Sequence, residues 1–283
     1  MNLRAMRRKL ARWVPEWLKA RYRARLFGYG TPPGSAGTVR EENGHLLVSF
    51  DGLEMRVPAA AAADVRYHFV ENADSVEEIR GLLRAARETG GVLMDVGAMR
   101  GLLAAAWILA RPGNRAMAYE PSPAFVRDLQ RLAELNGLGE RFHSVTAAVG
   151  RAPGTVRAGV DAMGLIDFAP VAGAETFAAA ITSLDAECAR VGMPDAVKVD
   201  VEGDELEVLA GARELLEARR PLLFLELHLD ELERRGLAAG GVAELLGPLG
   251  YRFETSQGEP LAAAALARSP KAVLRVVARP GPG

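Results

Sequence analysis

Two acidic residues stand where apolar runs end, each followed by a turn. Asp95 precedes a loop that contains Gly97 and Gly101, and Glu120 lies 25 residues further on, ahead of Pro121. Glycines let a backbone approach a ligand closely, and an acid ahead of such a loop suits a cationic ligand better than a diphosphate. A strand-end acid at this spacing can accept hydrogen bonds from both ribose hydroxyls of an adenosine. We therefore predict that Asp95, Gly97, Gly101 and Glu120 bind a nucleoside-containing cofactor.

The segment VKVDVEGDE places three charges on one side of a strand. Lys198, Asp200 and Glu202 alternate with valines, so they share a face if the strand runs through them. Central parallel strands are normally apolar on both faces, and buried charges are costly unless they are paired or face a cleft. We expect Asp200 and Glu202 to contact the cofactor. The structural alternative is a buried Lys198–Asp200 ion pair.

The next apolar run, LFLELHL, carries Glu226 and His228 on one face. If the two strands are neighbours, both residues converge with Asp200 and Glu202 on one pocket. We expect His228 to be a general base oriented by Glu226, with Asp200 as the second candidate. A variant places Mg²⁺ or Mn²⁺ on Asp200, Glu226 and His228, but the spacing is not diagnostic and no metal is favoured. The other histidines are assigned to structure or surface: His45, His68 and His143.

The elements that would position these residues alternate between strand and helix. From residue 91 onward apolar strands alternate with amphipathic helices, which predicts an α/β fold with a doubly wound, mostly parallel sheet. A helix at 75–89 is expected to begin with Ser75 as N-cap and Glu78 completing a capping box. Residues 155–177 break the alternation and are expected to be an insertion near the active edge. The expected strands of the sheet are 92–96, 116–120, 142–149, 196–201, 222–228, 251–255 and 273–278, the last two as an edge hairpin, and the expected helices include 102–109, 124–135, 205–217 and 241–249.

The N-terminal region differs in charge from the rest. Residues 1–27 hold nine Lys or Arg and one acid, although the 283-residue chain has a net charge of −1. We expect a basic amphipathic arm, kinked at Pro15, that packs on its own domain; a membrane-surface or acidic-partner role is the alternative. The expected division is an arm and linker at 1–37, a short β-rich segment at 38–72 and the main domain at 73–283.

Composition limits the setting. Hydrophobic residues make up 49% of the chain and charged residues 25%, which is ordinary for a globular protein. Cys188 is the single cysteine, so no intrachain disulfide or cysteine-based zinc site is expected. No apolar run approaches the roughly 18 residues of a membrane-spanning helix. We expect a cytoplasmic protein, peripheral to a membrane if the arm binds one.

In this order, the motifs resemble those of the FkbM-type methyltransferases over residues 91–253. The matching segments are DVGAMRG, YEPSP, ELNGL, TSLD, KVDVEGDELEVLAGA and ELH. The resemblance implies a class I, Rossmann-like fold with a seven-stranded sheet, S-adenosylmethionine as cofactor, and a hydroxyl acceptor on a small molecule, natural product or sugar. It also implies that Asp95, Gly97 and Glu120 help to bind the cofactor. The family pattern is DVGAN followed by an apolar residue, and here Met99 stands in place of the Asn and Arg100 in place of the apolar residue. This departure leaves three alternatives: weaker cofactor binding, a loop reshaped by Arg100, or lost activity.

Two other functions compete with methyl transfer. An NAD-dependent oxidoreductase is supported by Glu120, but the middle glycine of the dinucleotide fingerprint is replaced by Met99. A non-catalytic binding or scaffold protein on the same fold would account for Met99 and the basic arm. Nucleic acid is not the expected partner, because the body outside the arm is acidic. The identity of the acceptor and the oligomeric state have no readable signal.

Overall fold

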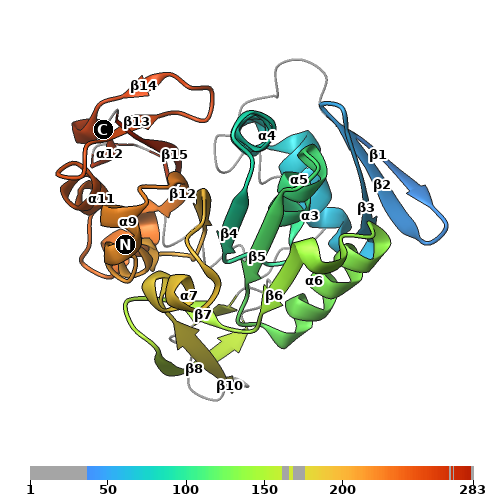
Figure 1. Cartoon of the computed structure of the whole chain (residues 1–283), viewed down its shortest axis with the longest axis horizontal. Coiled ribbons are helices and arrows are strands. Elements are labelled where there is room, and N and C mark those ends of the chain that lie inside the picture. The colour runs from blue at the N-terminus through green and yellow to red at the C-terminus, as the bar shows by residue number, and fades with distance from the viewer. Residues whose placement is uncertain (1–36, 161–165, 168–175, 268, 270, 282–283) are drawn as a thin grey trace, which may run out of the picture.

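The computed structural model describes residues 37–160, 166–167, 176–267, 269 and 271–281. The arm expected at 1–27, and the linker expected after it up to residue 36, lie outside these residues. The described strands form three sheets, of which the largest has eight strands in the order β14-β13-β15-β12-β11-β4-β5-β6 (Figure 1). These strands are β4 (Val92–Val96), β5 (Arg115–Tyr119), β6 (Phe142–Val145), β11 (Ala196–Val199), β12 (Leu222–His228), β13 (Tyr251–Glu254), β14 (Pro260–Leu261) and β15 (Val273–Pro280).

The predicted α/β class and doubly wound sheet are confirmed. Strands β6, β5, β4, β11 and β12 run parallel, whereas β15 is antiparallel to both of its neighbours. The expected C-terminal hairpin is corrected: β15 pairs with β13 but inserts between β13 and β12. The two-residue β14 brings the described sheet to eight strands instead of seven.

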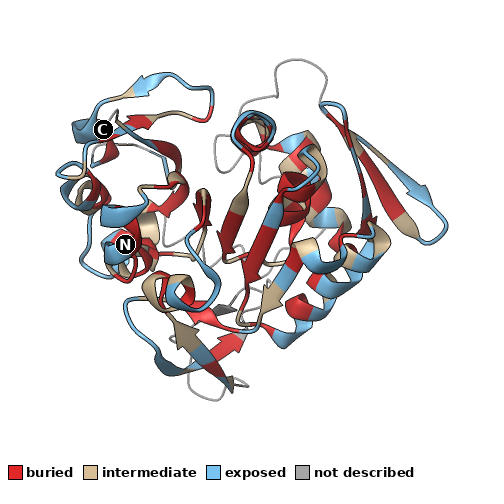
Figure 2. Ribbon diagram, viewed as in Figure 1, coloured by how far each residue is buried: buried red, intermediate tan, exposed pale blue. Residues whose placement is uncertain are grey.

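Alternating side chains give the sheet two buried faces. Leu93, Ala116 and Ala196 join one apolar cluster, and Met94, Met117 and Val197 join the other. This alternation follows from the pleat of a strand. The first face packs against α4 (Ala73–Glu88), α5 (Leu102–Ala110) and α6 (Pro123–Leu135), and the second against α7 (Leu184–Val191), α8 (Glu205–Ala210), α9 (Arg213–Ala218), α10 (Leu229–Arg234), α11 (Gly240–Leu246) and α12 (Ala263–Leu266). Figure 2 shows the central strands β4 and β5 as buried.

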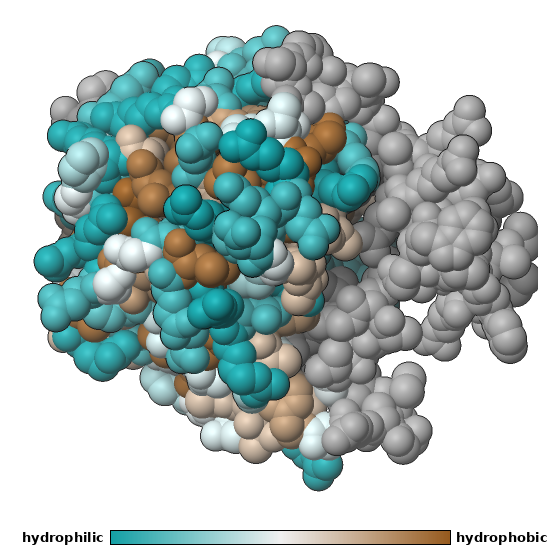
Figure 3. All heavy atoms as spheres, turned by 90° about the vertical axis from the view of Figure 1, so that its right-hand side faces the viewer, coloured by the Kyte–Doolittle hydropathy of each residue, from teal (hydrophilic) through white to brown (hydrophobic). Residues whose placement is uncertain are grey.

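A second sheet precedes the main one in sequence. It consists of β1 (Thr38–Glu42), β2 (His45–Phe50) and β3 (Leu53–Pro58), paired antiparallel through two tight turns. Its apolar face joins the cluster that covers α4 and α5. Seen from this side, the described surface is mostly hydrophilic with scattered hydrophobic residues (Figure 3). The chain then continues through η1 (Ala59–Ala61), α3 (Ala62–Arg66) and the π-helical turn η2 (Tyr67–Glu71) into α4.

The expected insertion forms a third sheet. Strands β7 (Ala148–Val149), β10 (Thr176–Thr182), β8 (Gly154–Val160) and β9 (Ile166–Asp167) pair in that order, so the single strand expected over 142–149 is divided between two sheets. A one-turn helix, η3 (Gly139–Arg141), leads into β6. No helix in the described part of the chain is both long and apolar enough to pass through a bilayer.

Two local expectations are corrected. Asn72, not Ser75, caps α4: its side-chain oxygen accepts hydrogen bonds from the backbone N–H groups of Asp74 and Ser75. Ser75 and Glu78 are therefore free for other contacts, described below. The helix expected over 205–217 is interrupted at Gly211, where a Cβ atom would lie 2.1 Å from the carbonyl oxygen of Gly150.

Candidate active site

A cavity of about 530 Å³ opens at the carboxyl ends of β4, β5 and β11. Ligands in open α/β sheets bind at this edge. Apolar side chains from α5, α6 and the third sheet cover part of the wall, including Leu102, Phe125 and Val149. Titratable side chains also line it, and acids outnumber bases: Asp64, His68, Asp95, Arg100, Tyr119, Glu120, Arg151, Lys198, Asp200, Glu202, Asp204, Glu207 and Arg235.

The loop after β4 combines three left-handed residues in five positions. Gly97, Met99 and Gly101 have φ of 79°, 49° and 77°. A Cβ atom on Gly97 would lie 1.8 Å from the carbonyl oxygen of Asp200, so the loop can pass β11 only as glycine. Gly101 is the N-cap of α5 and its Cβ would meet Leu129 at 2.3 Å, whereas only Gly97 of these two lines the cavity.

Glu120 closes the far side of the same loop. Its carboxylate accepts hydrogen bonds from the backbone N–H groups of Met99 (2.9 Å) and Ser122 (2.8 Å), which leaves further lone pairs on both oxygens. Burial raises the pKa of Glu120 to about 7, although the two N–H donors act in the opposite direction. The residue is 4% exposed and lines the cavity. A carboxylate held this way can accept hydrogen bonds from a ligand's hydroxyl groups.

Arg100 is where the loop departs from the resembling family, and its side chain is tied down on three sides. Its Nε donates to Asp128 Oδ2 at 2.9 Å, and its Nη1 pairs with Asp64 of α3. The guanidinium carbon lies 4.7 Å from the centre of the Phe125 ring, within reach of a cation–π contact. Arg100 thus joins the β4 loop to α3 and to the first turns of α6.

Four charges of alternating sign cross the sheet on the face toward α4. They are Asp95 of β4, Lys198 of β11, Glu226 of β12 and Arg275 of β15, with Lys198 opposite Asp95 and Glu226 opposite Arg275 in the strand register. We call this set the charge row. Glu78 of α4 completes it: its carboxylate lies 2.9 Å from Lys198 Nζ and accepts a hydrogen bond from Arg275 Nε at 2.9 Å.

The charge row controls protonation at the cavity floor. Burial would lower the pKa of Lys198, but Glu78, Asp200 and Glu226 outweigh it, so Lys198 remains charged. Burial raises the pKa of Asp95 to about 6, opposed by Lys198. Asp200 has its pKa raised well above the ordinary value by burial and by Glu226, and this effect outweighs Lys198 at 3.7 Å.

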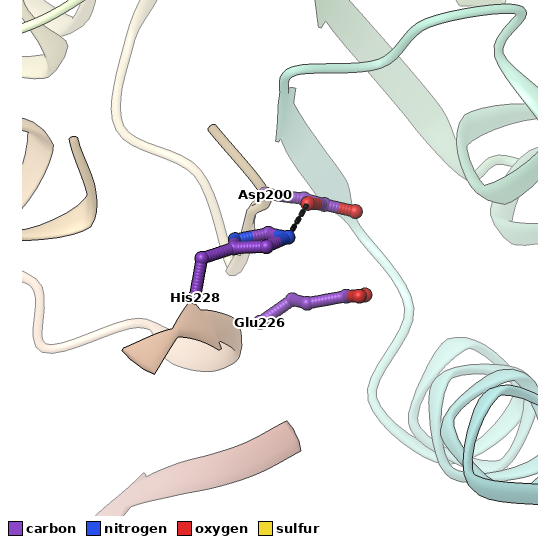
Figure 4. A group of neighbouring side chains, drawn as sticks. All are labelled: Asp200, Glu226 and His228. Carbon is purple, nitrogen blue, oxygen red and sulfur yellow. Dashed lines mark ion pairs between the residues drawn. The ribbon is translucent and has the colours of Figure 1, made fainter. Parts of the chain in front are cut away.

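His228 lies behind the cavity wall. Its Nδ1 contacts Glu205 Oε1 at 2.8 Å, and its Nε2 lies 3.4 Å from Glu202. The same Nε2 lies 3.7 Å from Asp200, the ion pair drawn in Figure 4. Burial would lower the pKa of His228, but Glu205, Glu202 and Asp200 raise it to about 10. His228 is therefore an imidazolium near neutral pH, which has no lone pair to act as a base.

The expected pairing of Glu226 with His228 is corrected by these contacts. Glu226 Oε1 instead accepts a 2.6 Å hydrogen bond from Arg275, and burial of Glu226 is outweighed by Arg275 and Lys198, which lower its pKa. Beta-strand β11 ends at Val199, so Asp200 and Glu202 lie in the following turn, with Glu202 at a φ of 53°. Asp200 and Glu202 line the cavity, whereas Glu226 and His228 are not among the described residues that line it.

The metal site considered from the sequence has a geometric basis, but Lys198 competes with a metal ion for the same carboxylates. Asp200, Glu226 and His228 each bring one potential ligand atom within 4.8 Å of the others. The ammonium group of Lys198 already lies 3.7 Å from Asp200 and 3.6 Å from Glu226. A divalent ion would have to displace this fixed cation and the proton on His228, so a metal is not favoured on these residues.

Sequence reasoning missed Asp64 and His68, which α3 and η2 bring to the cavity. Their spacing of four residues, with Val65 and Phe69 buried on the other side, was an available signal. It also missed Glu205. The sequence suggests an exposed acid in the first turn of a helix, but Glu205 is fully buried at the start of α8.

Residues 95–253 match the model of the methyltransferase FkbM domain, and this matched region is more than half of the chain. The chain belongs to the FkbM methyltransferase family. Members of this family use S-adenosylmethionine. The strand order β6-β5-β4-β11-β12-β15-β13, with β15 antiparallel to both of its neighbours, is that of the class I methyltransferase fold. None of the curated proteins matches the chain.

Three solved structures that match the chain are distant from it in sequence. A methyltransferase FkbM from Methylobacillus flagellatus KT is 18% identical with a TM-score of 0.44, and the match covers 67% of this chain and 43% of that one. The C-terminal domain of precorrin-6Y C5,15-methyltransferase from Rhodobacter capsulatus is 21% identical (73% and 88% covered, TM-score 0.41). A SAM-dependent methyltransferase from Agrobacterium tumefaciens is 13% identical (86% and 72% covered, TM-score 0.46). The chain therefore spans less than half the length of the Methylobacillus protein.

The cavity suits the family's cofactor. S-adenosylmethionine supplies an electrophilic methyl group on a sulfonium and carries an ammonium. The excess of carboxylates complements these positive charges, and Glu120 offers oxygens to ribose hydroxyls. The adenine ring would find an apolar wall, which is formed by Leu102, Phe125 and Val149. On this chemistry, Asp95, Glu120 and the Gly97 loop are the residues that would hold the cofactor.

Proposed function

We propose that the chain transfers a methyl group from S-adenosylmethionine to a hydroxyl group of a small molecule or glycan. The observation that carries the proposal is the meeting of the glycine loop, Glu120 and Asp200 at the ends of three adjacent parallel strands, in the part of the chain that matches the FkbM family. The main task of such a site is to align the acceptor with the methyl group, because the sulfonium is already activated.

A hydroxyl acceptor is supported by the groups that line the cavity. An alcohol must lose its proton as the new carbon–oxygen bond forms, so the site needs a proton acceptor within hydrogen-bond reach. His68 and Asp200 both line the cavity and could take that role. The cavity's basic side chains are already paired with acids: Arg100 with Asp64, Arg151 with Glu207, and Arg235 with Asp204. This pairing disfavours an anionic acceptor such as a nucleic-acid backbone.

Two measurements test the function. Isothermal titration calorimetry with S-adenosylhomocysteine, S-adenosylmethionine and NAD⁺ should show binding of the two sulfur compounds; preferential binding of NAD⁺ would refute the proposal in favour of an oxidoreductase. Transfer of tritium from [methyl-³H]S-adenosylmethionine should then be measured with matched alcohol, amine and carboxylate acceptors of one carbon skeleton. Label on the alcohol supports O-methylation, and label confined to the amine would leave a methyltransferase of another class.

A further inference from the structure

His68 enters the cavity from outside the region that matches the family. It lies on η2, a π-helical turn in which the Asn72 N–H donates to the Tyr67 carbonyl at 3.1 Å, five residues back. The extra residue in such a turn changes the direction of the side chains that follow it, and π-turns are frequent at functional sites. Here Asp64 and His68 both line the cavity. The turn therefore adds an imidazole to a site whose floor is made by β4 and β11.

The backbone around His68 is held on both sides. Val65 and Phe69 are fully buried, and the Phe69 ring makes an edge contact with Phe50, with centroids 5.4 Å apart. The N–H of Gly37 donates to the Phe69 carbonyl at 3.0 Å. Asn72 then caps α4 directly after the turn. The position of His68 is thus fixed by core packing and does not depend on a ligand.

His68 lines the cavity, and one of its ring nitrogens makes a hydrogen bond to another described residue. Nδ1 lies 2.7 Å from Oγ of Ser75, which is fully buried in the first turn of α4. The Tyr67 ring meets the imidazole edge-on, with centroids 5.0 Å apart. These contacts set the orientation of the ring. If Nδ1 carries the hydrogen and donates it to Ser75, Nε2 presents a lone pair to the cavity.

We propose that His68 is the catalytic base of the proposed methyl transfer, with Nε2 accepting the proton of the acceptor hydroxyl and Ser75 fixing the tautomer. The acceptor oxygen forms a bond to the methyl carbon while the methyl–sulfur bond breaks, and the electron pair of that bond stays on sulfur. The acceptor O–H bond breaks in the same step, and its proton forms the His68 imidazolium. This proton then leaves to solvent. The inference rests on the proposed function.

The charges around His68 are consistent with this role. Burial lowers the pKa of His68, and Glu226 of β12, Arg275 of β15, Glu78 of α4 and Asp64 of α3 act on it with opposing signs. The ring is therefore neutral at pH 7. The two candidates expected from the sequence fit the role less well. His228 already carries a proton at neutral pH, and the raised pKa of Asp200 favours its protonated form.

Nuclear magnetic resonance tests the tautomer without any acceptor. The chain has four histidines, so ¹⁵N-labelled histidine gives four ring systems that His→Gln variants can assign. In the S-adenosylhomocysteine complex at pH 7.5, His68 should be neutral with hydrogen on Nδ1, and His228 should be doubly protonated. In Ser75→Ala the preference for Nδ1–H should be lost. A His68 ring with hydrogen on Nε2, or one that is charged at pH 7.5, would overturn the assignment.

Turnover provides the second readout. The probes are catechol and methyl α-D-glucopyranoside with [methyl-³H]S-adenosylmethionine. His68→Gln should lower kcat at least about 100-fold, the usual scale for a general base. Its affinity for S-adenosylhomocysteine should stay within about twofold, because the ring is placed on the acceptor side. His143→Gln, at an exposed position of β6, is the matched control and should retain wild-type turnover.

The outcomes separate the two proposals. Failure of the wild-type chain to bind S-adenosylhomocysteine would refute the proposed function. Binding together with unchanged turnover in His68→Gln, or a loss of turnover confined to Asp200→Asn, would remove His68 from the mechanism and leave the methyltransferase proposal in place. If neither probe is methylated, the tautomer alone decides the assignment of His68.

Discussion

Acidification should weaken the binding of S-adenosylhomocysteine through Glu120. Ribose hydroxyls donate to a carboxylate, so the ionised form of Glu120 is the one that binds. Burial raises its pKa to about 7 in the free protein, and the bound state must have a lower pKa. Affinity therefore approaches its full value only well above pH 7 and is lost as the pH falls through that value. The ionised fraction drops from about 0.76 at pH 7.5 to about 0.09 at pH 6.0, which predicts about eightfold weaker binding, or about 1.3 kcal/mol.

The assay is isothermal titration calorimetry with S-adenosylhomocysteine at half-unit steps between pH 6.0 and 7.5 and constant ionic strength. Glu120→Gln should bind more weakly at pH 7.5, by roughly 1–3 kcal/mol, and should show a flat profile down to pH 6.5. Below that value Asp95, with a pKa of about 6, contributes its own loss. Glu134→Gln changes an exposed carboxylate on α6 and should keep the wild-type slope. An unchanged slope in Glu120→Gln, or tighter binding in acid, would refute the assignment of Glu120 to the ribose.

Three substitutions test the loop and the charge row. Met99→Asn should raise stability by about 1 kcal/mol and Tm by about 2–4 °C in calorimetry, because asparagine tolerates a φ of 49° better than methionine does; an unchanged or lower Tm would mean that no strain is stored there. Lys198→Met should cost about 3–5 kcal/mol in urea unfolding, since Glu78 loses one of its two buried cationic partners and keeps only Arg275. Lys198→Met/Glu78→Gln should recover part of that loss, and a cost below about 1 kcal/mol would contradict the role of the charge row. Gly97→Ala should weaken S-adenosylhomocysteine binding at least about tenfold, whereas Gly113→Ala, also left-handed but with open space around it, should bind normally; equal binding in both variants would show that the Asp200 contact does not position the loop.

Much of the fold was predictable because its signals are local. The apolar runs around Asp95, Glu120 and Lys198 alternate with helices, and chain topology rules then place their carboxyl ends at one edge of a parallel sheet. The positions of Asp95, Glu120, Asp200 and Glu202 at the cavity follow from that rule alone. The position of β15 between β13 and β12 could not be predicted, because no local pattern distinguishes an edge hairpin from a strand inserted between two others.

The partners of the buried charges were not predictable from spacing. His228 and Glu226 share a strand face, which favoured pairing them, yet Glu205 reaches His228 from α8 and Arg275 reaches Glu226 from β15. Both contacts join residues at least 23 positions apart in the sequence. His68 was missed for a related reason: its spacing of four residues from Asp64 predicts that the two side chains share a helix face, but nothing local indicates that this face meets the cavity.

The charge row also has a consequence for the order of folding. Arg275 lies on β15, which follows every other strand of the sheet in sequence, while its acidic partners Glu78 and Glu226 are made earlier. During synthesis, β12 is therefore made before Arg275. Until β15 is added, Glu226 has Lys198 as its only partner within the charge row, and one edge of β12 lacks its hydrogen-bonding strand. Two buried acids beside Lys198 alone are poorly compensated, which disfavours premature closure of the sheet against α4. The cavity floor should reach its native structure only after β15 has paired with β12, so completion of the site should be a late step in folding.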